Sequence, residues 1–135
     1  MRPGPALLAT LLAAAHPLAA QGTAAVTARA AASPDHYEGN CPARIEFVGH
    51  VTVTVPGTRL VYRWERSDGD SGKLLHVQVG VAGSAPPAPL VAALPSDFWR
   101  TGLPGHNGQY WEVLHILSPV DTRSGVARVD IECRN

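Results

Sequence analysis

The stretch Ala43-Arg-Ile-Glu-Phe-Val-Gly-His-Val-Thr-Val-Thr-Val55 decides the fold class of this chain of 135 residues. Side chains on a β-strand point alternately to its two faces. One alternate set in this stretch is apolar or small: Ile45, Phe47, Gly49, Val51, Val53 and Val55. The other set is mostly polar: Glu46, Val48, His50, Thr52 and Thr54. This alternation predicts a long strand that turns the first set toward a hydrophobic core.

Shorter runs of the same kind lie on both sides of this stretch, and each ends at a turn signal such as Pro56-Gly57. Proline cannot donate to a sheet, and glycine, aspartate and serine favour turns. The expected strands cover residues 23–32, 43–55, 60–65, 75–81, 90–99, 110–117 and 126–133. Short strands at regular spacing are typical of a sandwich or barrel. We therefore expect an all-β fold, an antiparallel β-sandwich of about seven strands with Trp64 in its core.

The first twenty residues have the pattern of a secretory signal peptide. Arg2 provides the positive charge, residues 6–15 form an uncharged apolar segment, and Leu18-Ala19-Ala20 precedes Gln21. Such a segment directs export and is then removed, and it is too short to span a bilayer. A buried N-terminal helix is the alternative. We divide the chain into a signal peptide, residues 1–20, and one domain, residues 21–135, and expect a secreted or periplasmic protein with no membrane insertion after signal removal.

Charge and cysteine content narrow the class of partner and the compartment. Basic and acidic residues are equal in number, 11 of each, which gives no basic surface for nucleic acid or anionic membranes. The only two cysteines are Cys41 and Cys133. In an exported protein this pair favours one intramolecular disulfide, which would close a loop of about 92 residues. Intermolecular pairing and free thiols are the alternatives.

Three motifs together resemble a known class of module. They are Tyr37-x-Gly39-x-Cys41-Pro42-x-x-Ile45-x-Phe47-x-Gly49, Val61-Tyr62-Arg63-Trp64-x-Arg66-Ser67-Asp68-Gly69 and Trp111-x-x-Leu114-x-Ile116-x-Ser118-Pro119. With the final strand, this pattern resembles the small immunoglobulin-like modules of exported bacterial proteins, notably actinobacterial ones, over nearly all of residues 25–135. The resemblance implies an immunoglobulin-like sandwich, a Cys41–Cys133 bridge and no enzymatic activity. The proline-rich segment Gly83–Pro89 and the Gly105–Tyr110 loop depart from the pattern.

No catalytic residue, metal ligand or cofactor is assigned from the sequence. Gly69-Asp70-Ser71-Gly72 matches the nucleophile segment of trypsin-like proteases, but no histidine lies in a matching context, so a turn is favoured. His50, His76 and His115 would form a zinc or copper site only if separate strands brought them together, and solvated surface histidines are expected. A small secreted hydrolase that uses Ser71 and a periplasmic metal-binding protein therefore remain as alternatives.

The expected function is that of an exported non-enzymatic binding module whose partner is an unidentified protein or glycan of the cell envelope. Two aromatic pairs flank the glycine-rich loop of residues 101–107. Because neighbours on a strand point to opposite faces, one member of each pair can be exposed and stack on a sugar or a partner. The candidate ligand-binding residues are Trp99, His106, Tyr110 and Trp111. Packing of both tryptophans in the core is the alternative.

Overall fold

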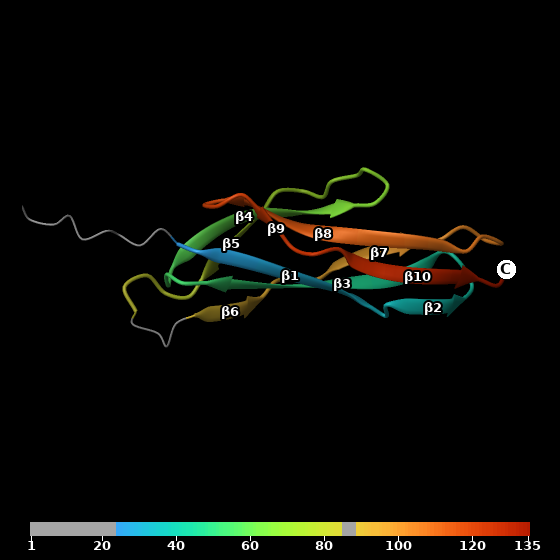
Figure 1. The fold of residues 1–135 in the computed structure, drawn as a ribbon, viewed down its shortest axis with the longest axis horizontal. Helices are drawn as coiled ribbons and strands as arrows, with labels where there is room; N and C mark the ends of the chain where they lie inside the picture. Colours follow the sequence, from blue (N-terminus) through green and yellow to red (C-terminus); the bar gives the residue numbers. More distant parts are fainter. Residues whose placement is uncertain (1–23, 85–88) are drawn as a thin grey trace, which may run out of the picture.

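The computed structural model describes residues 24–84 and 89–135, which form ten strands in two sheets (Figure 1). None of these residues is helical, so the described part of the chain contains no helix that could cross a membrane. The all-β fold class is therefore confirmed. The expected signal peptide, residues 1–20, lies outside the described residues.

The first sheet is built around the long strand predicted at residues 43–55. It contains β1 (Val26–Ser33), β3 (Ala43–Val53), β6 (Leu90–Ala93) and β7 (Asp97–Thr101). β3 pairs with β1 along one edge and with β6 and β7 in succession along the other, always antiparallel. β3 is long enough to hold both short strands because its alternating pattern continues without a break through 11 residues.

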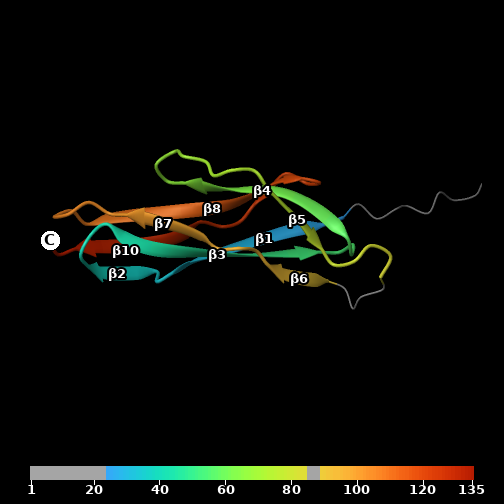
Figure 2. The ribbon, with the colours of Figure 1, turned by 180° about the vertical axis from the view of Figure 1, so that it is seen from behind.

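The second sheet contains the remaining six strands. They are β2 (His36–Gly39), β4 (Thr58–Arg66), β5 (Leu75–Val79), β8 (Gly108–Ser118), β9 (Thr122–Arg123) and β10 (Ala127–Cys133). Their order is β2-β10-β8-β4-β5, with β9 beside β8. β2 pairs with β10 in parallel, and these two strands lie near the C-terminus (Figure 2). The other pairs of this sheet are antiparallel.

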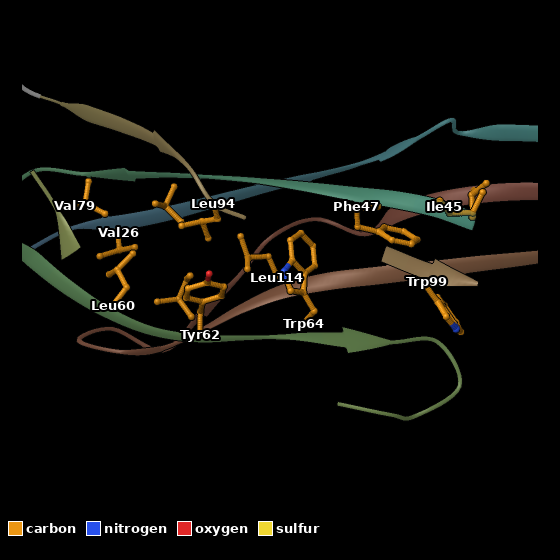
Figure 3. Packing of buried hydrophobic residues seen from close by; sticks show 14 of the residues in the cluster. Val26, Ile45, Phe47, Leu60, Tyr62, Trp64, Val79, Leu94, Trp99 and Leu114 are labelled. Atoms are coloured by element: carbon orange, nitrogen blue, oxygen red, sulfur yellow. The ribbon is translucent and has the colours of Figure 1, made fainter. Parts of the chain in front are cut away.

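The core lies between the two sheets, as Figure 3 shows for Tyr62 and Trp64 of β4. Trp64 is almost fully buried, as the sequence predicted, and its ring lies over Gly49 of β3. A Cβ atom at Gly49 would lie only 2.9 Å from Trp64 Cζ2 and 3.0 Å from Leu114 Cδ2. The strand therefore needs glycine here because the tryptophan occupies the space that a side chain would take.

Three details of the sequence prediction are wrong. The expected strand 90–99 is two strands, because Leu94 turns into the core just before Pro95, which has no N–H to donate. The stretch 37–42, Tyr-Glu-Gly-Asn-Cys-Pro, predicts a turn, but it contains most of β2. Val55 was expected to face the core, and so was Val81, which is in phase with Val77 and Val79 in the expected strand 75–81. Both are exposed, Val81 by 71%, because β3 ends at Val53 and β5 at Val79.

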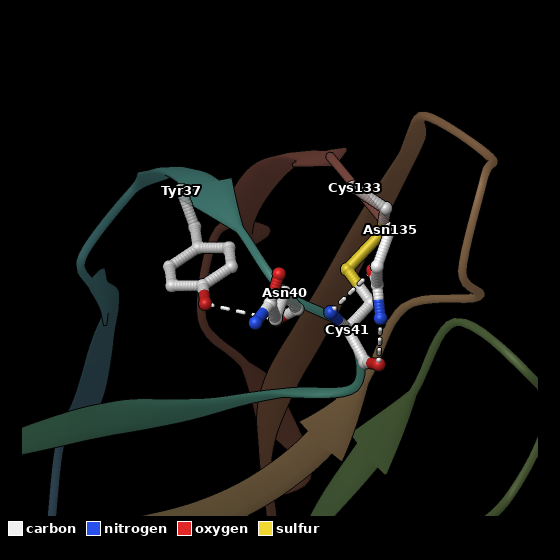
Figure 4. The surroundings of a disulfide bond; sticks show 5 residues. All are labelled: Tyr37, Asn40, Cys41, Cys133 and Asn135. Carbon is white, nitrogen blue, oxygen red and sulfur yellow. Dashed lines mark hydrogen bonds between the residues drawn. A yellow bond between two sulfur atoms is a disulfide. The ribbon is translucent and has the colours of Figure 1, made fainter.

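The expected disulfide between Cys41 and Cys133 is present, with a Cα–Cα distance of 5.5 Å and 92 residues between the two cysteines (Figure 4). The side chain of Asn135 adds two hydrogen bonds beside it. Its Oδ1 accepts from the Cys41 N–H at 3.0 Å, and its Nδ2 donates to the Cys41 carbonyl at 3.1 Å. The end of β10 is thus fastened to the start of β3 by one covalent bond and a pair of hydrogen bonds.

Candidate functional site

The four residues expected to bind a ligand are divided between the core and the surface. Trp99 is only 9% exposed and packs between Phe47 and Tyr110, at ring-centroid distances of 6.4 and 5.8 Å. His106 lies in the exposed loop between β7 and β8. Trp111 points to the outer face because its neighbour Tyr110 points inward. Trp99 and Tyr110 are therefore packing residues in this structure, and Trp111 and His106 remain accessible.

A hollow of about 310 Å³ adjoins Trp111 on the outer face of the second sheet. We call it the Trp111 pocket. β8 supplies its half-buried indole and the buried Val113. β4 supplies Glu65 and Arg66, β9 supplies Arg123, and the turn after β4 supplies the rim. Its lining residues are Glu65, Arg66, Gly69, Asp70, Ser71, Trp111, Val113 and Arg123.

The rim is held in place by hydrogen bonds to β8 and by a hydrogen bond within the turn that the sequence predicted. The Ser67 N–H donates to the Trp111 carbonyl at 2.9 Å, and the Trp111 N–H donates to Ser67 Oγ at 3.2 Å. The Asp70 N–H donates to Asp68 Oδ1 at 2.9 Å, and Gly69 has φ of +88°, a region that favours glycine. The backbone of the turn is therefore held in place beside Trp111, and the exposed residues Asp70 and Ser71 lie on the rim.

A network of charged side chains continues from the pocket along the outer face. His115 Nε2 lies 2.6 Å from Asp121 Oδ1, and His115 Nδ1 lies 3.3 Å from Glu65 Oε1. Glu65 also pairs with Arg63 at 3.2 Å and with Arg123 at 3.0 Å. Burial opposes ionisation of Glu65, but the guanidinium of Arg123 and the nearby His115 hold its pKa below the usual range. Glu65 is thus an anionic acceptor on one side of the pocket.

Of the three histidines that were predicted to be solvated, two are exposed and one is buried. His50 and His76 are exposed, as predicted, on β3 and β5. His115 was predicted to be solvated but is only 4% exposed, because Glu65 and Asp121 face both of its ring nitrogens. Within residues 24–84 and 89–135, these three histidines share no group of metal ligands.

The alternative nucleophile Ser71 lies on the rim of the Trp111 pocket. A hydrolytic serine needs a histidine that can accept its proton and a third group that orients this histidine. His115 is the histidine nearest in sequence to the pocket residue Val113. Its two nitrogens face carboxylates rather than a hydroxyl, an arrangement that serves an ion-pair network.

Sequence reasoning missed a buried carboxyl on the other side of the sheet from the pocket. Glu112 is 0% exposed and lies 3.3 Å from Arg66 Nε, and Arg66 Nη2 reaches Asp97 of the first sheet at 3.2 Å. Burial raises the pKa of Glu112 to about 9; Asp97 adds to the rise, and Arg66 opposes it. The signal was present in the sequence, since Glu112 is in phase with the core residues Leu114 and Ile116. Arg66, which contacts both Glu112 and Asp97, thus connects the two sheets behind the pocket.

No family of known proteins, no curated protein sequence and no solved structure matches the chain.

Proposed function

We propose that the chain is an exported, non-enzymatic binding module with an immunoglobulin-like β-sandwich fold. The strand order supports this fold. Immunoglobulin domains place the first, second and fifth strands in one sheet and the third, sixth and seventh in the other. In the present chain β1, β3, β6 and β7 form one sheet, in which β6 and β7 together take the place of the fifth strand. β4, β8 and β10 lie in the other sheet. Trp64 on β4 corresponds to the buried tryptophan of the third strand. The disulfide departs from that pattern, because it joins the start of β3 to the end of β10.

Export is supported by two features of different kinds. The first is the signal-peptide pattern of residues 1–20. The second is the Cys41–Cys133 disulfide, since such bonds persist in oxidising compartments and are rare in the cytosol. A location in the periplasm or outside the cell satisfies both.

The ligand we propose is one sugar residue of a cell-envelope glycan, bound in the Trp111 pocket. The observation that carries this proposal is a half-buried indole beside polar residues in a hollow of about 310 Å³. That volume is at the lower end of the range for small-molecule sites and suits a single ring. The indole offers an apolar face for the ring. Asp70, Ser71 and Arg123 offer acceptors and donors for its hydroxyl groups.

The test compares the wild-type protein with Trp111→Ala. Tag-free protein secreted from an exporting host would be titrated with envelope oligosaccharides by calorimetry. We expect Trp111→Ala to weaken binding at least tenfold, about 1.4 kcal/mol. The matched control is Phe98→Ala, because Phe98 is an exposed aromatic residue on the first sheet, under the guanidinium of Arg44 at 4.0 Å.

Three results would count against the proposal. Absence of saccharide binding up to millimolar concentrations would reject the glycan. Equal losses in Trp111→Ala and Phe98→Ala would reject the pocket. Binding of peptides alone, abolished by Trp111→Ala, would keep the pocket and replace the ligand class.

A further inference from the structure

The parallel pairing of β2 with β10 gathers four polar side chains at one edge of the second sheet. His36 is the register partner of Asp130, and Glu38 is the register partner of Glu132. Ile131, between the two acidic residues of β10, is buried in the core, so the side chains on either side of it point outward. One imidazole and three carboxyl groups therefore share one outer surface at the β2 edge of the sheet. The Trp111 pocket is lined by other strands, β4, β8 and β9.

The donor atoms of three of these residues are close enough to serve one ion. One ligand atom from each of His36, Glu38 and Glu132 lies within 4.8 Å of the others, and His36 Nε2 is 3.6 Å from Glu38 Oε1. Arg134 donates to Oε2 of Glu38, which leaves Oε1 directed to the imidazole. Zinc–ligand bonds are about 2.0–2.2 Å long, so small side-chain rotations would bring all three atoms into one coordination sphere.

Asp130 provides an independent indication of a ligand. It lines a hollow of about 390 Å³ together with His36 and Glu132. Its Oδ1 atom is shielded from solvent and accepts no hydrogen bond from the described residues. Shielded carboxylate oxygens normally have a partner. A cation held by His36 and Glu132 would be such a partner.

We propose that His36, Glu38 and Glu132 bind a divalent transition-metal ion of the Zn²⁺ type. The imidazole decides the class of ion. Imidazole with carboxylates suits zinc, copper and nickel, whereas calcium and magnesium are bound by oxygen ligands alone. The ion would connect the edge strand β2 to β10 on the outer face, opposite the core.

The test is a metal titration of tag-free protein, since an affinity tag rich in histidine would itself bind zinc. The protein would be treated with a chelator, dialysed and titrated with Zn²⁺ at neutral pH by competition with a chromophoric chelator. We expect one equivalent to bind. His36→Gln and Glu132→Gln should each weaken binding at least about tenfold, as loss of a ligand does. Arg134→Gln should strengthen it, because Glu38 gains a free oxygen and a competing positive charge is lost.

The control is His76→Gln, which removes an exposed histidine from β5 of the same sheet. Its affinity should equal that of the wild type. Urea unfolding of every variant without metal verifies that the exposed substitutions leave the fold intact. Three outcomes would overturn the proposal: no stoichiometric Zn²⁺ binding below about millimolar concentrations, an equal loss in His76→Gln and His36→Gln, or tight Ca²⁺ binding that does not depend on His36.

Discussion

Substitution of Glu112 by glutamine tests whether this buried carboxyl group is neutral in the folded protein. Its side chain is 0% exposed, and the charged groups that face it are Arg66 on the neighbouring strand and Asp97 on the opposite sheet. Burial raises the pKa of Glu112 to about 9. A protonated carboxyl and an amide have nearly the same shape, and each offers a donor and an acceptor. We therefore expect Glu112→Gln to fold and to keep its contacts with both neighbours.

The expected magnitude follows from the proton that the folded state retains. In the unfolded chain Glu112 ionises above about pH 4.3. In the folded protein it stays protonated until its pKa of about 9. Because the folded state then binds one more proton than the unfolded state, the free energy of unfolding falls by about 1.4 kcal/mol per pH unit between these limits. From pH 5 to pH 8 the loss is about 4 kcal/mol, and it is absent below pH 4.

Urea denaturation of the wild type and Glu112→Gln at pH 5, 6, 7 and 8 measures this loss. The difference between the two proteins at each pH removes the contribution of every other titrating group, including the histidines. From pH 5 to pH 8 the glutamine variant should gain about 4 kcal/mol of stability relative to the wild type.

A pH-independent difference would refute the reasoning. If Glu112→Gln is less stable than the wild type by about 3 kcal/mol or more at every pH, then Glu112 is ionised and Arg66 is its essential partner. Arg66 and Glu112, register partners on β4 and β8, would then form a buried ion pair within the second sheet.

Two further substitutions test the packing and the covalent link. Gly49→Ala should lower the free energy of unfolding by about 1–3 kcal/mol, because the new methyl group would overlap the buried side chains of Trp64 and Leu114; Gly125→Ala, whose methyl group would meet nothing within 4 Å, should be neutral in the same urea titration. Replacing both Cys41 and Cys133 by serine should cost about 4–5 kcal/mol through the added freedom of the unfolded chain, and a loss below about 1 kcal/mol would contradict that account.

The strands and their inner faces were largely predictable because they depend on local alternation. The burial of Phe47, Trp64 and Val129 follows from a period of two that any single strand displays. The phase of β8 also separates Tyr110 from Trp111, once Leu114 and Ile116 are taken as inward residues. Local pattern is therefore sufficient wherever one face of a strand is buried along its whole length.

The remaining features depend on contacts between distant parts of the chain. β2 has four residues and only intermediate or exposed positions, so its pairing with β10 has no local signal. The convergence of His36 with Glu132 follows from that pairing and was equally hidden. The burial of His115 depends on Glu65 of β4 and on Asp121, which directly precedes β9. Trp99 was ambiguous because the break at Pro95 interrupts the phase of its strand.

The position of β10 sets the order in which the second sheet can be completed. β10 does not add to an existing edge; it enters between β2 and β8, which are separated by most of the domain in sequence. Sheets that depend on such distant pairings fold slowly, because loop-closure entropy is lost before the contacts that compensate for it form. Until β10 has joined the sheet, β2 has no strand to pair with and Cys41 has no cysteine to bond. The β2 end of the sheet can therefore close only after the last strand of the chain is in place.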